Sequence, residues 1–315
     1  MRVIVTGGAG YIGGQTVLRL LDQDHSVFAI DCDTEPTLLI DYGAKWLTAD
    51  FAGEVALQAI ETFQPDAIIH CAGTSLVGPS MLDPEKYYDN NFYKTKMLCD
   101  WLVRQKIRTR LIFSSSAATY GNPVMTPCQE IDPADPISPY GQSKLMVDWM
   151  LQSYHRAYDL DYVSFRYFNA CGADSQARHG QRSGATHIIA RVLESIRDNS
   201  HFTLNGIDYA TEDGTCVRDY IHVEDLADAH VLACEPRIPA GVYNLGTNIG
   251  HSNRQVINMA EQITGEHVNL GVGSARPGDP AMLTADADKF CKVANWTARF
   301  GLEDMVSHAW AWYNR

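Results

Sequence analysis

The stretch Thr6-Gly7-Gly8-Ala9-Gly10-Tyr11-Ile12-Gly13 follows an apolar run at residues 3–5 and leads into a segment with helical periodicity. Gly7, Gly10 and Gly13 lack side chains that would block a tight turn, so backbone N–H groups can approach a diphosphate at a helix N-terminus. Asp31 ends the next apolar run, 18 residues beyond Gly13 (31 − 13). Its carboxylate can accept hydrogen bonds from ribose hydroxyls and would repel an added phosphate. The stretch therefore predicts a strand, turn and helix that bind NAD in preference to NADP.

Apolar runs of strand length alternate with helix-period segments through the first half of the chain. The expected strands lie at residues 3–5, 27–30, 67–69, 111–114 and 162–165, and the expected helices at 16–21, 55–63, 95–104 and 145–158. This alternation is typical of βαβ units with right-handed crossovers. The predicted fold class is α/β, a Rossmann-type doubly wound parallel sheet.

The second half of the chain has shorter elements. The segment from Cys171 to Gly184 is polar and rich in Gly, Arg and Ser, so it predicts a loop at a domain junction. Helical patterns follow at residues 187–196, 225–234 and 253–264, and Ser252 with Gln255 fits a capping box. Since 315 residues exceed the usual single core, we expect an NAD-binding domain over residues 1–170 and a smaller α/β substrate lobe over 171–315. Some segments of that lobe should return to the first domain.

The composition excludes several classes of function. The formal charge is −13 and no stretch concentrates Lys or Arg, which argues against nucleic-acid and anionic-membrane partners. The eight cysteines include no closely spaced pair, so we expect reduced thiols and no metal site. The hydrophobic runs are short, and Met1 leads straight into a strand without a signal-peptide pattern. We therefore expect a soluble, cytoplasmic protein.

Tyr140 and Lys144 carry the predicted chemistry. They stand four residues apart in Ser138-Pro139-Tyr140-Gly141-Gln142-Ser143-Lys144, just before a helical pattern, so a helix places both on one face. A nearby ammonium, reinforced by a cationic nicotinamide, favours the phenolate and should lower the tyrosine pKa from about 10. Tyr140 is then a candidate general base near neutral pH.

Two further groups follow predicted strands. Ser114-Ser115-Ser116 ends a strand at the carboxyl edge, where ligands of such sheets bind, so one of its hydroxyls should hold the substrate oxygen beside Tyr140. Asp50 and Phe51 follow the third strand region, where an acid and an apolar side chain could flank an adenine.

Nearly the whole chain is similar to the extended short-chain dehydrogenase/reductase family, and within it to the UDP-glucose 4-epimerases. The segments that carry this resemblance are TGGAGYIG from Thr6, YYDNN from Tyr87, SSSAATYG from Ser114, SPYGQSK from Ser138, RYFN from Arg166, TEDGTCVRDYIHVEDLA from Thr211, YNLG from Tyr243 and RPGD from Arg276.

The resemblance implies reversible epimerisation at C4 of a UDP-sugar, UDP-glucose or UDP-galactose, through a 4-keto intermediate. Tyr140 would take the proton of the 4-hydroxyl, Ser116 would orient that hydroxyl, and hydride would pass from C4 to NAD. The 4-keto sugar would then rotate and take the hydride back on its other face. Because net redox is zero, NAD would stay bound between turnovers. The family also implies a homodimer, with the helical patterns at 95–104 and 145–158 paired across a two-fold axis.

The same resemblance assigns the remaining site residues. It implies cofactor contacts from the glycine loop and from Tyr11, Ile12, Asp31, Asp50, Phe51, Cys71, Ala72, Gly73, Asn90, Tyr140, Lys144 and Phe168. It implies substrate contacts from Ser116, Tyr140, Asn169, Arg218, Tyr220, Arg276, Asp279 and Leu283. Guanidinium groups also suit a diphosphate on physical grounds, since they offer paired donors.

The sequence departs from the family in places. Some members place a lysine where this chain has Ser75, and the family's N-N-V-x-G-T run is Asn90-Asn91-Phe92-Tyr93-Lys94-Thr95 here. NAD retention is thus expected to be weaker or to depend on another group. Of the family's E-T-H-L-I-P run we carry over only His187. Leu283, which borders the sugar 2-substituent in the family, is intermediate in size and favours UDP-glucose and UDP-galactose.

Several alternatives stay open. UDP-N-acetylhexosamines or UDP-pentoses are other substrates for the same C4 chemistry. A nucleotide-sugar dehydratase or decarboxylase of the same family would begin with the same oxidation, but such relatives carry Asp or Glu just after the serine, where this chain has Ala117 and Ala118. A non-catalytic NAD sensor would keep the fold without the reaction, and the presence of Ser116, Tyr140 and Lys144 argues against it.

Overall fold

The computed structural model describes residues 1–33, 36–275 and 279–315. Its strands are β1 Arg2–Thr6, β2 Ser26–Asp31, β3 Lys45–Thr48, β4 Ala67–His70, β5 Arg110–Ser114, β6 Asp161–Tyr167, β7 Asn169–Cys171, β8 Phe202–Asn205, β9 Val217–His222, β10 Gly241–Leu245, β11 Gly250–Ser252, β12 Leu270–Gly273 and β13 Met282–Leu283. Its helices are α1 Tyr11–Asp22, α2 Thr37–Asp41, α3 Glu54–Phe63, α4 Val77–Ser80, α5 Pro84–Tyr87, α6 Lys94–Arg104, α7 Pro139–Tyr158, α8 Ile188–Arg197, α9 Val223–Ala233, α10 Asn253–Thr264, α11 Asp288–Ala294 and α12 Leu302–Tyr313, with a π-helical turn η1 Tyr88–Tyr93 and a 3₁₀ turn η2 Ala117–Tyr120.

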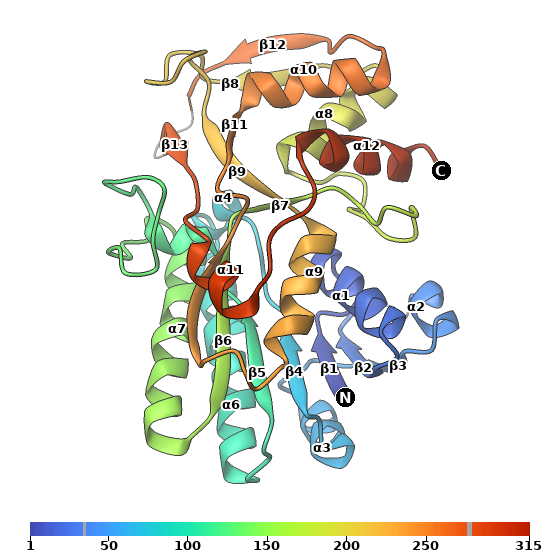
Figure 1. The fold of residues 1–315 in the computed structure, drawn as a ribbon, viewed down its shortest axis with the longest axis vertical. Coiled ribbons are helices and arrows are strands. Elements are labelled where there is room, and N and C mark those ends of the chain that lie inside the picture. The colour runs from blue at the N-terminus through green and yellow to red at the C-terminus, as the bar shows by residue number, and fades with distance from the viewer. Residues whose placement is uncertain (34–35, 276–278) are drawn as a thin grey trace.

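Seven parallel strands form the main sheet, in the order β10-β6-β5-β4-β1-β2-β3. The five strands expected from the sequence all lie in this sheet, so the predicted doubly wound α/β fold is confirmed. The sheet occupies the lower half of the molecule in Figure 1. The four residues after Arg2 in β1 are fully buried, as expected for a parallel strand covered on both faces.

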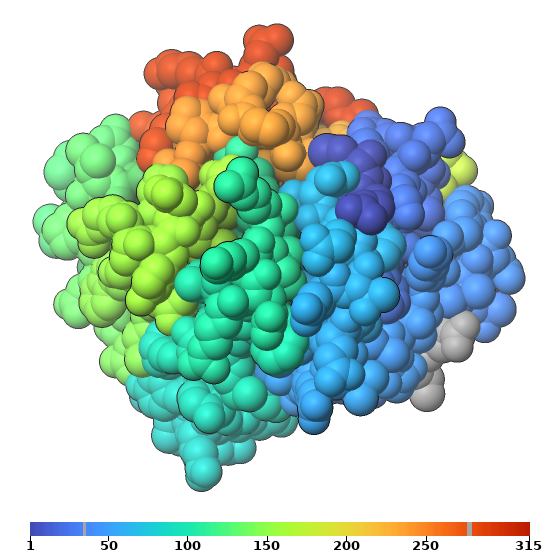
Figure 2. Space-filling model, turned by 90° about the horizontal axis from the view of Figure 1, so that it is seen from below, coloured from blue at the N-terminus to red at the C-terminus, as the bar shows by residue number. Residues whose placement is uncertain are grey.

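Two layers of helices cover the sheet. Residues of α1, α9 and α11 pack on one face in a cluster with strand residues such as Val5 and Ile69. Residues of α3, α6 and α7 pack on the other face with Ile4 and Phe113. Seen from below, α7, α6 and α3 follow one another across the surface in yellow-green, green and blue (Figure 2). The strand β10 and the helices α9 and α11 reach this body from the second half of the chain.

The remaining C-terminal elements form a smaller lobe above the sheet (Figure 1). Its core joins α8, α10 and α12 with β8 and β9, around Val192, Val256 and Val306. The expected capping box is present, because the Ser252 hydroxyl accepts from Gln255 N and the Gln255 side chain accepts from Ser252 N. No helix in the described part of the chain combines the length and apolar character needed to span a bilayer.

The strand order reverses at β1, which pairs with β2 on one side and β4 on the other. The loops that follow β1 and β4 therefore leave the same carboxyl edge in opposite directions and open a crevice between them. The loops of residues 7–10 and 71–75 meet there.

Buried histidines make stability depend on pH. Burial lowers the pKa of His70 and His222 to about 3 and that of His230 to about 4. An unfolded histidine titrates near 6.5, so the unfolded chain binds more protons below that pH and stability falls as the pH falls toward 4. Each histidine should contribute a loss of about 1.4 kcal/mol per pH unit. Burial raises the pKa of Asp219 to about 6. Below pH 6 the folded chain therefore holds a proton on Asp219 that the unfolded chain has lost. The resulting gain in stability offsets the loss caused by one of the three histidines.

Urea unfolding at about pH 7, 6 and 5 measures this slope. The variant His230→Leu should lose one histidine's share of it, and an unchanged slope in that variant would contradict the assignment.

Candidate active site

The glycine loop between β1 and α1 is packed too tightly for side chains. Gly7 has φ +74°, and a Cβ there would lie 2.6 Å from Ala72 N in the loop after β4. A Cβ on Gly13 would lie 2.1 Å from the Gly7 carbonyl oxygen. Gly10 N donates to the same oxygen at 3.0 Å. The loop therefore has the shape that brings backbone N–H groups to a diphosphate.

Asp31 lies at the end of β2, against the glycine loop. Its carboxylate accepts from Ala9 N at 2.9 Å and from Asp33 N at 3.0 Å. A carboxylate has about four acceptor positions, so the two backbone contacts leave capacity for ribose hydroxyls. Asp31 thus supports the glycine loop as well as facing the cavity beside it.

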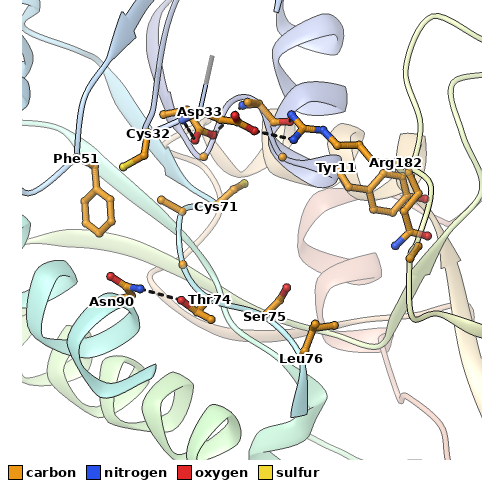
Figure 3. A pocket seen from close by; sticks show the side chains of 18 of the residues that line it. Tyr11, Cys32, Asp33, Phe51, Cys71, Thr74, Ser75, Leu76, Asn90 and Arg182 are labelled. Atoms are coloured by element: carbon orange, nitrogen blue, oxygen red, sulfur yellow. Dashed lines mark hydrogen bonds and ion pairs between the residues drawn. The ribbon is translucent and has the colours of Figure 1, made fainter. Parts of the chain in front are cut away.

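That cavity has a volume of about 580 Å³ and is drawn in Figure 3. It is lined by the predicted cofactor residues Gly7, Gly10, Tyr11, Asp31, Asp50, Phe51, Cys71, Ala72, Gly73 and Asn90. Ile12, Gly13, Tyr140, Lys144 and Phe168 line a second, adjoining cavity of about 1430 Å³. The two cavities share residues of the glycine loop and of the loop after β4, so they form one continuous groove.

Lys94 is a feature of the smaller cavity that the sequence analysis recorded only as a departure from the family. Its Nζ lies 2.8 Å from Asp50 Oδ2 and 2.9 Å from Asn90 Oδ1. Asp50 also accepts from Ala52 N at 3.0 Å. These contacts lower the pKa of Asp50 although burial opposes them. Asp50 therefore faces the cavity as an ionised group shared with a lysine.

The loop after β4 is held by Asn91, which the sequence analysis did not assign to the site. Asn91 Oδ1 accepts from Thr74 N at 2.6 Å, and its Nδ2 donates to Thr74 O and Ser143 Oγ, each at 3.0 Å. Asn91 lies in the π-helical turn η1, a geometry often found at functional sites. It links the cofactor loop to α7, where Tyr140 stands. A buried amide with three contacts could have been noticed in the sequence only through its neighbour Asn90.

Tyr140 is placed by the start of α7. Ser138 caps the helix, its hydroxyl accepting from Gly141 N at 3.1 Å, and Pro139 occupies the first helical position. Tyr140 then projects from the first turn to the side of Ser116, whose hydroxyl acts to lower the pKa of the phenol. Both side chains line the larger cavity.

Of the three serines after β5, the structure directs only Ser116 to Tyr140. Ser114 Oγ lies 3.3 Å from Cys71 Sγ, and Ser115 Oγ donates to the buried Asp148 carboxylate at 3.2 Å. The alternation of a strand and the turn that follows it separates the three hydroxyls.

Lys144 lies one turn after Tyr140 on the same face of α7. Its Nζ donates to Ser114 O at 2.8 Å and lies 6.0 Å from the centre of the Tyr140 ring. Burial lowers the pKa of Lys144 to about 8, so it remains mostly protonated at neutral pH. Burial also raises the pKa of Tyr140, and the Ser116 hydrogen bond opposes this only in part. The lowered tyrosine pKa expected from the sequence is thus not produced by the chain's own groups.

The burial of Cys71 decides whether it is a reactive thiol. Burial raises its pKa to about 11, so the thiol is protonated at neutral pH and weakly nucleophilic. Cys71 therefore lines the groove without acting as a nucleophile.

The larger cavity brings together most of the predicted substrate residues from distant parts of the sequence, namely Ser116, Tyr140, Asn169, Arg218, Tyr220, Asp279 and Leu283. Arg218 Nη2 pairs with Asp279 Oδ1 at 3.3 Å, and Asn169 Nδ2 donates to Asp219 O at 2.9 Å. Arg276 lies outside the described residues. His187, carried over weakly, lines both cavities.

Other chain segments that line the groove were missed by the sequence analysis. They are residues 181–186, Arg191, residues 202–205, Asn253 and the C-terminal aromatic residues Trp312 and Tyr313. The loop from Cys171 to Gly184 was expected only as a connection between domains, and it also contacts Tyr11 beside the glycine loop. No local pattern marks these residues, because their role depends on how the smaller lobe sits on the sheet.

Residues 3–246 match the model of the NAD dependent epimerase/dehydratase family. A UDP-glucose 4-epimerase of Halalkalibacterium halodurans is 41% identical over 320 residues, covering 99% of this chain and 96% of that protein. A probable UDP-arabinose 4-epimerase of Arabidopsis thaliana is 36% identical over 340 residues, covering 98% of this chain and 80% of that protein. The crystal structure of UDP-glucose 4-epimerase from Bifidobacterium longum in complex with NAD⁺ and UDP has a TM-score of 0.92 and 34% identity, covering 100% of this chain and 98% of that one.

Proposed function

This chain belongs to the NAD dependent epimerase/dehydratase family, and on that basis we propose that it is an enzyme that reversibly epimerises C4 of a UDP-sugar, with UDP-glucose and UDP-galactose as its substrate pair. NAD is its resident cofactor. The relatives and solved neighbours that carry UDP-glucose 4-epimerase in their names support this reading over nearly the full length of the chain.

The residues of the smaller cavity fit NAD. A Cβ at Gly7 would clash with the loop after β4 and one at Gly13 with the Gly7 carbonyl oxygen, so only glycine allows the tight turn that brings backbone N–H groups to a diphosphate. Asp31 offers free acceptor positions for the ribose hydroxyls, and Phe51 provides an apolar wall. Phe168 closes the groove near Tyr140. Bound NAD supplies the acceptor for hydride from C4 and returns that hydride to the 4-keto sugar.

Tyr140 moves the proton in this mechanism. It takes the proton of the sugar 4-hydroxyl as C4 is oxidised and returns it when the opposite face of C4 is reduced. Ser116 holds the same oxygen by a hydrogen bond and keeps it beside the phenol. Lys144 keeps a positive charge near the phenol from its anchored position on Ser114 O. The volume of about 1430 Å³ gives the 4-keto sugar room to rotate between the two half-reactions.

The observation that carries the choice of epimerisation is that the described residues place no free carboxylate in the cavity beside Tyr140. Ala117 and Ala118 follow Ser116 in η2 and line the cavity. Among the described residues that line the larger cavity, only Asp279 bears a carboxylate, and it is paired with Arg218. Dehydration needs an acid and a base to remove water, so the 4-keto sugar has no assistance toward elimination. The 4-keto sugar therefore reacts by taking the hydride back at C4, which completes the epimerisation.

Arg218 and Arg276 hold the UDP diphosphate, and Asn169, Tyr220 and Asp279 position the nucleotide sugar. Leu283 packs at the edge of a cluster formed by Ala117, Tyr120, Phe168 and their neighbours. Its size sets the space for the sugar 2-substituent, and it favours a hydroxyl over an N-acetyl group.

The test is to incubate the purified chain, with no NAD added, with UDP-glucose, UDP-galactose, UDP-N-acetylgalactosamine and UDP-arabinose, and to identify products by NMR. Interconversion of UDP-glucose and UDP-galactose is expected. Equal or faster turnover of the N-acetyl sugar or the pentose would overturn the substrate preference. A 4-keto-6-deoxy product would mean that the enzyme is a dehydratase and not an epimerase.

Substitution of single serines separates their roles. Ser116→Ala should lower kcat roughly 10- to 100-fold, because it removes one hydrogen bond to the reacting oxygen. Ser115→Ala, the matched control, should leave kcat within about twofold and lower the free energy of unfolding by about 1 kcal/mol, since its hydroxyl contacts Asp148 instead. Steady-state kinetics and urea unfolding measure both. Equal kinetic losses would contradict the assignment of Ser116.

The same proposal extends to domains and assembly. Residues 1–170 form the NAD-binding domain, and α9, β10 and α11 complete its sheet and helix layer. Most of residues 171–315 bind the nucleotide sugar. Exposed Met97 and Trp149 on the adjacent helices α6 and α7 support a homodimer through these helices. Light scattering, which gives the mass of the particle in solution, tests whether the chain forms this homodimer. All eight cysteines are free, which suits the reducing cytoplasm.

A further inference from the structure

A strap of residues 172–187 crosses the glycine loop and is anchored to α1. The Tyr11 hydroxyl donates to Gly172 O at 2.7 Å, and Gln15 Nε2 donates to Asp174 Oδ2 at 3.0 Å. His179 Nε2 lies 2.9 Å from Tyr11 O. Arg178 pairs with both Asp174 and Asp22 of α1. The strap therefore has a fixed position over the helix N-terminus at which a diphosphate binds.

Arg182 extends from this strap along the rim of the smaller cavity (Figure 3). Its Nη1 lies 2.6 Å from Asp33 Oδ2, and its Nη2 donates to Ala9 O within the glycine loop at 3.3 Å. The side chain is 70% exposed, so its ion pair is solvated and contributes little on its own. A guanidinium carries five N–H donors, and these two contacts leave donors for an anion beside Ala9.

A full positive charge near this groove would strengthen the binding of a diphosphate. The glycine loop offers only N–H dipoles, and the chain as a whole carries −13. Among the described residues that line the smaller cavity, Lys94 and Arg182 are the lysine and arginine side chains. Lys94 is bound to Asp50 and Asn90, with Asp89 at 3.6 Å. Position 75, on the loop after β4, is a serine.

We propose that Arg182 is the cation that binds the diphosphate of NAD, reaching it from the strap. The inference rests on the proposed function, in which NAD is the resident cofactor. Arg182 keeps its place against Ala9 O and exchanges the solvated contact with Asp33 for the diphosphate oxygens, which offer a stronger charge-assisted pair. In this chain the strap thus supplies the charge that the loop after β4 lacks.

The test is direct titration of the NAD-free protein with NAD, ADP-ribose and adenosine by calorimetry. Arg182→Gln should weaken NAD and ADP-ribose roughly tenfold or more, because a charge-assisted hydrogen bond to phosphate is lost. Adenosine, which has no phosphate, should bind the variant and the parent equally. Ser75→Lys lines the same cavity, and in the Arg182→Gln background it should restore NAD binding.

Asp33→Asn is the matched control, because it breaks the ion pair and keeps the guanidinium. It should leave NAD binding unchanged or stronger. Equal losses in Arg182→Gln and Asp33→Asn that include adenosine would mean that Arg182 only holds the strap, and this would overturn the proposal. Unchanged NAD binding in Arg182→Gln would overturn it as well. Failure of the parent protein to bind NAD at all would instead refute the proposed function.

Discussion

Replacing Tyr140 by phenylalanine is expected to lower kcat by roughly 10³- to 10⁴-fold, at the upper end of what a positioned acid–base group contributes. The phenol lies beside Ser116 at the larger cavity, and among the described residues that line this cavity the one carboxylate, Asp279, is paired with Arg218. The ring itself stays, so its packing against Tyr87, with ring centres 6.2 Å apart, is kept. NAD binding should therefore remain close to that of the parent. Turnover is measured by NMR of the sugar products, and NAD retention by the absorbance of the bound cofactor. The expected combined result is a loss of turnover with NAD still bound.

Tyr87→Phe is the control for this prediction. Tyr87 is also aromatic and is fully buried, but its hydroxyl donates to Ser75 O at 2.7 Å and it does not line the larger cavity. Its loss should cost about 1 kcal/mol of stability and leave kcat within a few fold. A Tyr140→Phe enzyme with near-normal kcat, or a Tyr87→Phe enzyme as impaired as Tyr140→Phe, would remove Tyr140 from the mechanism.

Gly13→Ala should abolish NAD retention, with a loss of affinity of roughly 100-fold. In an ordinary helix, alanine is favoured over glycine by about 1 kcal/mol. At Gly13 the added Cβ would lie 2.1 Å from the Gly7 carbonyl oxygen. The oxygen belongs to the backbone and the Cβ is fixed by its bond to Cα, so neither can rotate away, and the glycine loop must open at a cost of about 2–3 kcal/mol. Bound NAD per chain after purification, followed by titration, measures the effect.

The control for this substitution is Gly301→Ala. A Cβ at Gly301 would meet nothing nearer than Asp304 Oδ2 at 4.0 Å, so this variant should fold and bind NAD like the parent. The steric argument fails if Gly13→Ala retains NAD as the parent does.

The sequence by itself determined the sheet and was enough to propose Tyr140, Lys144 and a serine of the run after β5 as the reacting groups. Apolar runs and helical periods alternate because parallel strands are buried on both faces and their crossover helices on one, and both periods are local. The glycines at 7, 10 and 13 and the pair Tyr140 and Lys144 are also local, since one loop or one helical turn contains each set. Five strands, the cofactor loop and the shared face of α7 could therefore be predicted.

Tertiary structure alone decided which of these groups meet. Ser116 faces Tyr140 while Ser115 turns to Asp148, and Lys94 reaches Asp50 from another element. Arg182 comes to Ala9 across 173 positions of sequence. Burial, not proximity of Lys144, governs the pKa of Tyr140. Such contacts depend on how distant segments pack and on the water that this packing removes. Neither effect produces a periodicity or a residue spacing that could be recognised in the sequence.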